Sequence, residues 1–243
     1  RANKTDDHGV DWPIRYQDIA PWYDHVEKFA GISGSLEGLD QLPDGKFLPP
    51  MKMNCVETEA KQKIEKAFPT RKMIIGRCAN LTEPTKEHLE LGRGRCQYRN
   101  ECEKGCSFGA SFSSLSATLP AARRTNNLTT VTDAIVHSVT YDNVSKRATG
   151  VKIIDANTKD YRQYSGRIIF LCASTLGSTQ IMLNSISESF PNGVANSSDT
   201  LGHYLMDHIF MSGARGEHPG FQENYYSGRR PNGIYIPRDR NVT

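Results

Sequence analysis

The stretch IIFLCA at residues 168–173 constrains the fold of this chain more than any other feature. A continuous apolar run of this kind is typical of a strand that is buried on both faces of a parallel sheet. Ser174 follows it directly as a predicted N-cap, and Leu176, Ile181 and Leu183 have helical spacing. We therefore predict a buried strand that leads straight into a helix, as in α/β folds. Ligands in such folds bind at the carboxyl ends of the strands, where Ala173 and Ser174 would lie.

The residues before this run predict a small antiparallel meander. Apolar residues alternate with polar ones over residues 134–141 and 148–155, and a third extended run covers residues 161–164. Turn-forming residues at 142–143 and 157–160 separate the three runs. We expect three short strands that pair in chain order.

The first half of the chain has a different pattern. Large apolar residues recur at helical spacing over residues 19–29, and Gly31 is placed to end that helix. A second amphipathic helix is predicted at residues 57–68 and a short strand at 72–76, whereas the glycine-rich segment 90–109 is irregular. The whole chain is therefore predicted to be α/β in the broad sense, an α+β mixture.

Charge and hydropathy exclude two classes of partner. The chain carries 30 Lys and Arg against 27 Asp and Glu, a net charge of +3, which gives no electrostatic case for binding nucleic acid. The longest apolar stretch is also far below the ~20 residues of a membrane helix, so we predict no transmembrane segment.

Three of the six cysteines are clustered. Cys96, Cys102 and Cys106 form the pattern C-x5-C-x3-C in the glycine-rich segment. Thiolates are soft ligands for zinc or iron–sulfur clusters, but structural zinc sites have four ligands and begin with a shorter spacing. Three cysteines suit a three-iron cluster (3Fe-4S). Three free thiols, or one disulfide and one thiol, remain open alternatives.

Several motifs, spread over nearly the whole chain, resemble the glucose–methanol–choline (GMC) family of flavin oxidoreductases, near its gluconate, sugar and glycoside dehydrogenase branch. The motifs occur in the family's order. They are DWPIRY at 11–16 with PWY at 21–23, CEKGCSFGA at 102–110, ATGV at 148–151, ASTLGSTQ at 173–180 and LGHYLMDH at 201–208.

The resemblance implies an FAD-dependent enzyme that oxidises an alcohol group of a sugar, glycoside or polyol by hydride transfer to the flavin. It implies a partial Rossmann-like FAD-binding domain that contains the meander, and part of a substrate-binding domain. We expect mixed substrate-domain and cap elements in residues 1–110. The FAD-binding portion is expected in 111–200 and the start of the substrate-binding domain in 201–243.

The resemblance also implies roles for individual residues. Residues that match Ala134 and Val136 lie by the adenine end of FAD, and those that match Ala173 and Ser174 lie by its adenosine or pyrophosphate. Some membrane-associated relatives carry a three-iron cluster on a similarly spaced cysteine triad. It passes electrons to a cytochrome or small-subunit partner. A periplasmic location is favoured by the resemblance, and a cytoplasmic one stays open.

Two family features have no match in this chain. No G-x-G-x-x-G fingerprint occurs, since the nearest candidate, Gly92-Arg93-Gly94, lacks the third glycine. The catalytic histidine is expected beyond residue 243, so we expect the chain to be the central part of the enzyme. Two alternatives remain, an iron–sulfur electron-transfer module and a non-catalytic carbohydrate-binding remnant.

Overall fold

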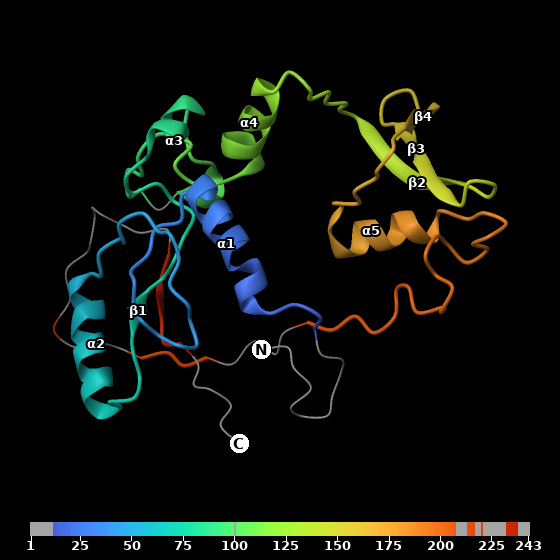
Figure 1. Cartoon of the computed structure of the whole chain (residues 1–243). Helices are drawn as coiled ribbons and strands as arrows, with labels where there is room; N and C mark the ends of the chain where they lie inside the picture. The colour runs from blue at the N-terminus through green and yellow to red at the C-terminus, as the bar shows by residue number, and fades with distance from the viewer. Residues whose placement is uncertain (1–11, 100, 208–212, 217–219, 221–231, 238–243) are drawn as a thin grey trace. The chain divides into compact units, whose positions relative to one another are not determined.

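The structure is a computed structural model that describes residues 12–99, 101–207, 213–216, 220 and 232–237. The chain divides into two compact units (Figure 1). The first comprises residues 1–128 and 216–243, and the second comprises residues 129–215.

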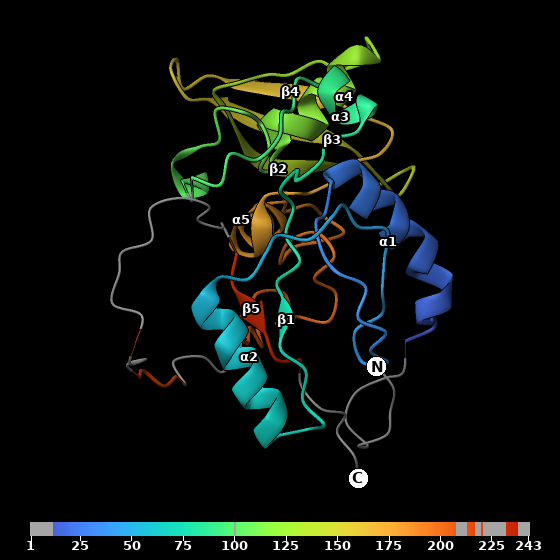
Figure 2. The same cartoon turned by 90° about the vertical axis from the view of Figure 1, so that its left-hand side faces the viewer.

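The first unit is mostly helix and loop. Its elements are the α-helices α1 (Tyr16–Ala30), α2 (Cys55–Ala67), α3 (Lys86–Glu90) and α4 (Leu119–Arg124), the 3-10 turn η1 (Cys102–Lys104), the π-helical turn η2 (Ser114–Thr118), and the short strands β1 (Ile74–Ile75) and β5 (Ile234–Tyr235). Strands β1 and β5 pair antiparallel, with Ile75 opposite Ile234, and lie side by side in Figure 2. The predicted first helix, second helix and short strand are thus confirmed, within a few residues at each end.

Gly31 ends α1, as predicted, and the position needs a glycine for two reasons. Its φ of 75° is left-handed, and its N–H donates to the carbonyl of Glu27 at 2.9 Å. A Cβ atom at this position would lie 2.1 Å from Cδ2 of Leu81, which is fully buried. The backbone at the end of α1 therefore packs directly against the side chain of Leu81 in the core of the unit.

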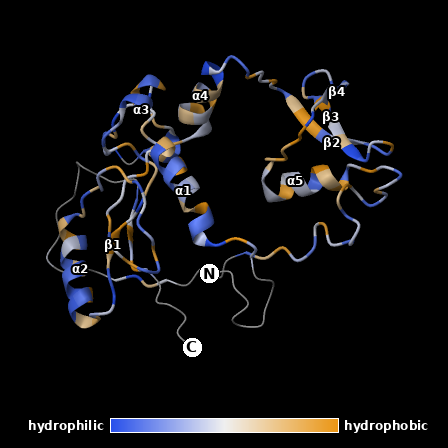
Figure 3. Cartoon of the chain, in the orientation of Figure 1, coloured by the Kyte–Doolittle hydropathy of each residue, from blue (hydrophilic) through white to orange (hydrophobic). Residues whose placement is uncertain are grey.

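Helix α2 is held by its cap rather than by burial, since none of its residues is buried and its surface is largely hydrophilic (Figure 3). The amide N–H of Glu57 donates to Oδ1 of Asn54 at 2.8 Å, and Oε2 of Glu57 accepts from the N–H of Asn54 at 2.8 Å. This reciprocal capping box satisfies two backbone donors that the helix leaves unpaired.

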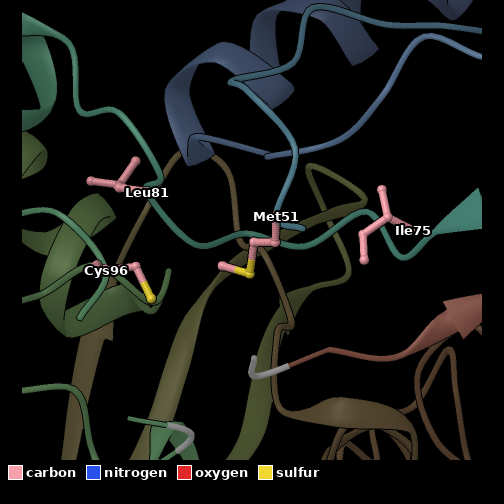
Figure 4. Packing of buried hydrophobic residues seen from close by; sticks show 5 residues of the cluster. Met51, Ile75, Leu81 and Cys96 are labelled. Atoms are coloured by element: carbon pink, nitrogen blue, oxygen red, sulfur yellow. The ribbon is translucent and has the colours of Figure 1, made fainter. Parts of the chain in front are cut away.

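The core of the first unit lies between β1 and the cysteine-containing segment (Figure 4). Its buried members are Met51, Ile75, Leu81, Cys96 and Ala110. Cys96 of the predicted triad is a buried member of this core, and Cys106 is partly buried and packs against it. The cysteine segment is therefore part of the packed interior, not a loose loop.

The second unit contains the predicted meander. Strands β2 (Ala134–Asp142), β3 (Arg147–Asp155) and β4 (Tyr161–Ser165) form an antiparallel sheet in the order β2-β3-β4. Gly150 in β3 is buried, and a Cβ atom there would lie 2.2 Å from the carbonyl oxygen of Tyr164. Strand β4 can therefore lie this close to β3 because Gly150 has no side chain.

Helix α5 (Ser174–Leu183) packs on β2 at the edge of this sheet. Just beyond the helix, the buried hydroxyl of Ser185 accepts from the N–H of Val139 at 2.8 Å and donates to the carbonyl of Ile181 at 2.5 Å. The rings of Tyr141 and Phe190 pack edge to face, with 4.8 Å between the ring centroids. These contacts cover the outer edge of β2, where ladder hydrogen bonds end.

The predicted buried strand at residues 168–173 is wrong. The segment has no strand structure, and Ile168 and Phe170 are 70% and 80% exposed. A strand requires a hydrogen-bonded neighbour, and no strand of the described residues pairs with this segment. The prediction of Ser174 as N-cap is also wrong, because Ala173 holds the cap position and Ser174 is the first helical residue.

The mixed α/β class is confirmed at a coarse level, with helices and antiparallel strands in the described residues. A Rossmann-like sheet is not among them. The predicted domain boundaries near residues 110 and 200 stay predictions. Within the described part of the chain, no helix has the length and apolar character needed to cross a membrane.

Candidate functional site

The three clustered cysteines line one pocket in the first unit. Cys96 is buried, and Cys102 and Cys106 are half-buried. Asn80 and Phe108 complete the wall near the cysteines. The irregular segment predicted at residues 90–109 thus folds back on itself and gathers the triad, which sequence spacing alone could not establish.

Each sulfur receives a hydrogen-bond donor or a backbone contact. The N–H of Tyr98 donates to Sγ of Cys96 at 3.4 Å. The side-chain amide of Asn80, which is 5% exposed, donates to Sγ of Cys102 at 3.5 Å. N–H groups directed at sulfur favour the thiolate over the thiol.

Two thiols of the pocket have pKa values shifted in opposite directions. Burial raises the pKa of Cys96, and the neighbouring thiols Cys102 and Cys106 raise it further. Burial also acts to raise the pKa of Cys106, but hydrogen bonds from backbone N–H groups of residues 108, 110 and 111 outweigh it, and Arg99 adds to them. The pKa of Cys106 therefore lies below its ordinary value, so Cys106 is the better anionic ligand of the two.

Arg93 lies in the same segment of the chain and is buried, with 1% of its surface exposed. Its Nε donates to the carbonyl of Gly109 at 3.0 Å, and its two terminal nitrogens donate to the carbonyls of Ala110 at 3.2 Å and Phe29 at 3.3 Å. Burial lowers its pKa, and the charge of Cys106 opposes that change. The guanidinium also lies over the ring of Phe112, 5.7 Å from its centre.

The predicted three-iron cluster is not supported by this arrangement. No group of three His, Cys, Asp or Glu side chains in the described ranges is placed to hold a metal ion. The pocket has a volume of about 20 Å³, which is room for roughly one water molecule. The donor set has the right chemistry, but the pocket would have to widen to admit a cluster.

The predicted adenine-side residues lie at the start of β2. Ala134 and Val136 are both half-buried, and they pair with Asp155 and Ile153 of β3. Ile135 between them is 55% exposed. The two predicted residues thus share one face of the sheet, as the period of a strand requires.

The predicted pyrophosphate-side residues lie at the N-terminus of α5 in the same unit. Ala173 and Ser174 are both exposed, and Ser174 has a left-handed φ of 63°. The first N–H groups of a helix lack intrahelical partners, so this end can accept an anionic group. Nothing in the structure tests these four assignments, and they stay predictions.

Sequence reasoning missed Arg93 and Asn80. Arg93 was noted only as part of an incomplete glycine motif. Its position next to Gly94 was the one available signal, since a Cβ atom at Gly94 would lie 3.3 Å from the carbonyl oxygen of Phe108. Asn80 lies 22 residues from Cys102 in sequence, and no local pattern connects them.

The described residues define the class of this protein as a mixed α/β protein with an antiparallel meander, a following helix and a cysteine-lined pocket. Residues 5–210 match the family model described as GMC oxidoreductase. The chain therefore belongs to the GMC oxidoreductase family, as the sequence resemblance predicted. The family is FAD-dependent in general.

Two curated relatives are similar to most of the chain. One is 2-methyl-1,2-propanediol dehydrogenase of Mycolicibacterium austroafricanum, 28% identical over 220 residues, which cover 85% of this chain and 37% of the relative. Another is the fructose dehydrogenase large subunit of Gluconobacter japonicus, 22% identical over 204 residues, which cover 82% of this chain and 36% of the relative. The chain thus spans little more than a third of the length of either protein.

Proposed function

We propose that this chain is part of an FAD-dependent dehydrogenase that oxidises an alcohol group of a polyol or sugar by hydride transfer to the flavin. The observation that carries the proposal is the family match over residues 5–210. The two relatives are named for a diol and for a ketose, and both compounds carry oxidisable hydroxyl groups. The common feature of the proposed substrates is therefore an oxidisable CH–OH group in a compound with at least one further hydroxyl.

FAD, when bound, would supply the acceptor for the hydride. The residues of the second unit fit its adenosine half. The N-terminus of α5 presents unpaired N–H groups to a phosphate, and the exposed Ala173 and Ser174 leave this end open. Ala134 and Val136 offer a half-buried apolar face to a flat ring.

Substrate oxidation also requires a base for the hydroxyl proton. We assign this role, on the family resemblance, to a histidine beyond residue 243. The contribution of this chain is then to hold the nucleotide end of the cofactor and fix its position.

A second candidate function is electron transfer through an iron–sulfur cluster, which would require the 20 Å³ pocket to widen. Cys96, Cys102 and Cys106 line the same pocket, and N–H donors reach their sulfurs. Hydrogen bonds to sulfur are among the features that tune such clusters. A cytochrome or a small subunit would then be the electron acceptor; one of the relatives is itself named as a large subunit.

The absorption spectrum and iron content of the purified full-length enzyme test both functions. We expect flavin bands that bleach when a polyol or fructose is added without oxygen. Ala134→Arg should reduce the bound FAD at least tenfold, because a charged side chain would enter the adenine face. Ile135→Arg, which changes the exposed residue next to it, is the matched control and should keep FAD.

Failure of each function has its own signature. A colourless enzyme that does not take up added FAD, yet still binds sugars, would contradict the flavin proposal and favour the carbohydrate-binding alternative. A cluster would give stoichiometric iron that is lost in Cys102→Ser and kept in Cys55→Ser, where the cysteine is exposed and distant in sequence. Equal iron in both variants, or none in the unmodified enzyme, would rule the cluster out.

A further inference from the structure

One end of the three-stranded sheet carries a pocket that the proposed function does not use. Residues of the turn between β2 and β3, of the start of β3 and of the end of β4 line it. Its volume is about 550 Å³, and small-molecule sites typically have roughly 300–1,000 Å³. The charged residues that line it are Arg147 and Arg167, and none of its lining residues is acidic.

A β-bulge shapes this end of the sheet. Thr140 of β2 pairs with Gly150, but Tyr141 pairs with Ala148, so Thr149 is an extra residue on β3. Bulges of this kind bend a strand and redirect its side chains. On the other side of β3, the N–H of Gly166 donates to the carbonyl of Thr149 at 3.0 Å. The chain that leaves β4 is thereby held beside the start of β3, where both arginines line the pocket.

The arginines of this sheet differ in whether they have an acidic partner. Arg162 of β4 forms an ion pair with Asp155 at 3.2 Å. Within the described part of the chain, the side chains of Arg147 and Arg167 form no ion pair and no hydrogen bond. Two guanidinium groups at one pocket repel each other, and an anion bound between them would relieve that repulsion.

The carboxylates near this end of the sheet are bound elsewhere. Asp142 lies opposite Arg147 in the register, but its carboxylate accepts from the N–H of Ser145 at 2.9 Å and from the hydroxyl of the same residue. Glu188 accepts from the side-chain amide of Asn143 at 3.3 Å. Neither carboxylate lines the pocket, so its arginines remain available to a ligand.

The pocket is separate from the predicted adenine contacts. Ala134 is at one end of β2, where it pairs with Asp155, whereas Asp142 and Arg147 pair at the other end. Strand β2 has 9 residues, and at roughly 3.3 Å per residue its two ends lie about 25 Å apart. An anion at Arg147 is therefore not the adenine end of FAD.

We propose that Arg147 and Arg167 form a binding site for the phosphate group of a small molecule. Guanidinium groups bind phosphate oxygens through paired, charge-assisted hydrogen bonds, so two arginines at one pocket suit a doubly charged anion better than chloride. The hydroxyl of Ser165, which also lines the pocket, is a further donor.

The test is carried out on the full-length enzyme, and inorganic phosphate is the probe. Arginines are modified with phenylglyoxal at constant ionic strength, with phosphate or with chloride, and the modified positions are mapped by mass spectrometry. We expect phosphate to slow the modification of Arg147 and Arg167 several-fold. Arg162 is the internal control, because its partner is already Asp155, and its rate should be the same in both salts.

Calorimetric titration with phosphate tests the contribution of each arginine. Arg147→Gln and Arg167→Gln should each weaken phosphate binding about tenfold or more, since each removes charge-assisted hydrogen bonds. Arg162→Gln is the matched control on the same sheet and should leave the affinity unchanged. All three side chains are exposed, so the variants are expected to fold.

Three results would overturn the proposal. Equal protection of Arg162 would show a general salt effect, and protection of only one of the two pocket arginines would exclude a shared site. Protection by phosphatidylglycerol vesicles, with none by inorganic phosphate, would identify a membrane surface as the ligand instead. None of these measurements depends on flavin or turnover, so this site and the proposed dehydrogenase function can fail independently.

Discussion

Ser174 shows how one residue can carry backbone strain at the start of an element. Its φ of 63° is left-handed, a conformation in which every residue with a Cβ atom is disfavoured relative to glycine. Such outliers persist where the surroundings impose them and often occur near ligand sites. The strained residue is one of the four predicted cofactor contacts.

We predict that Ser174→Gly stabilises the protein by about 0.5–1 kcal/mol, because glycine adopts this backbone conformation without strain. The free energy of unfolding is measured by urea denaturation followed by circular dichroism. Ser178→Gly, within the regular part of α5, is the control and should destabilise by roughly 1 kcal/mol. A loss of stability in both variants would show that Ser174 is not strained.

At the scale of elements, the edge of β2 depends on a residue outside the sheet. Ser185 is 4% exposed, accepts from the N–H of Val139 and donates to the carbonyl of Ile181. Without this hydroxyl, a largely buried backbone donor at the sheet edge would lose its partner. The contact connects α5 to the meander.

Ser185→Ala should therefore destabilise the protein by about 1–2 kcal/mol, as measured by the shift in the urea midpoint. Ser189→Ala removes an exposed hydroxyl that donates to Asn143 at 2.8 Å, and it should cost less than about 0.5 kcal/mol. Equal effects of the two substitutions would argue against a buried contact at Ser185.

At the scale of the whole molecule, the chain consists of two compact units, and where it first passes from one to the other, after α4, it has no regular structure. Residues 123–133 are all exposed, and the segment after α4 has no strand until β2 begins at Ala134. Exposed backbone outside helices and strands is where proteases cut native proteins.

We predict that limited digestion with thermolysin cuts before Leu128 or Val131, which are 37% and 48% exposed. Mass spectrometry of the products identifies the cut. Val144, although 91% exposed, lies in a tight turn whose N–H groups bond to Asp142, and it should resist. A first cut at Val144 instead would show that exposure alone decides the site.

The sequence was sufficient for those elements whose hydrogen bonds and packing are local. The α1 helix ends at Gly31, as predicted, and α2 begins at a capping box. The three strands of the meander pair in chain order. These features depend on turns and on hydrophobic periodicity, which involve residues close together in the sequence. The family followed from motifs in order, and the comparison over residues 5–210 confirmed it.

Only the tertiary structure could decide what depends on distant residues. The apolar run 168–173 has the composition of a buried strand, yet it is exposed because a strand also needs a neighbour, which composition does not supply. Asn80 reaches Cys102, and Arg93 reaches Phe29, across 22 and 64 residues. The sequence by itself determined α1, α2, α5, the meander and the family. Only the fold could place the three thiols around one pocket and bury Arg93 in the same segment, because chain packing brings together residues that are far apart in the sequence.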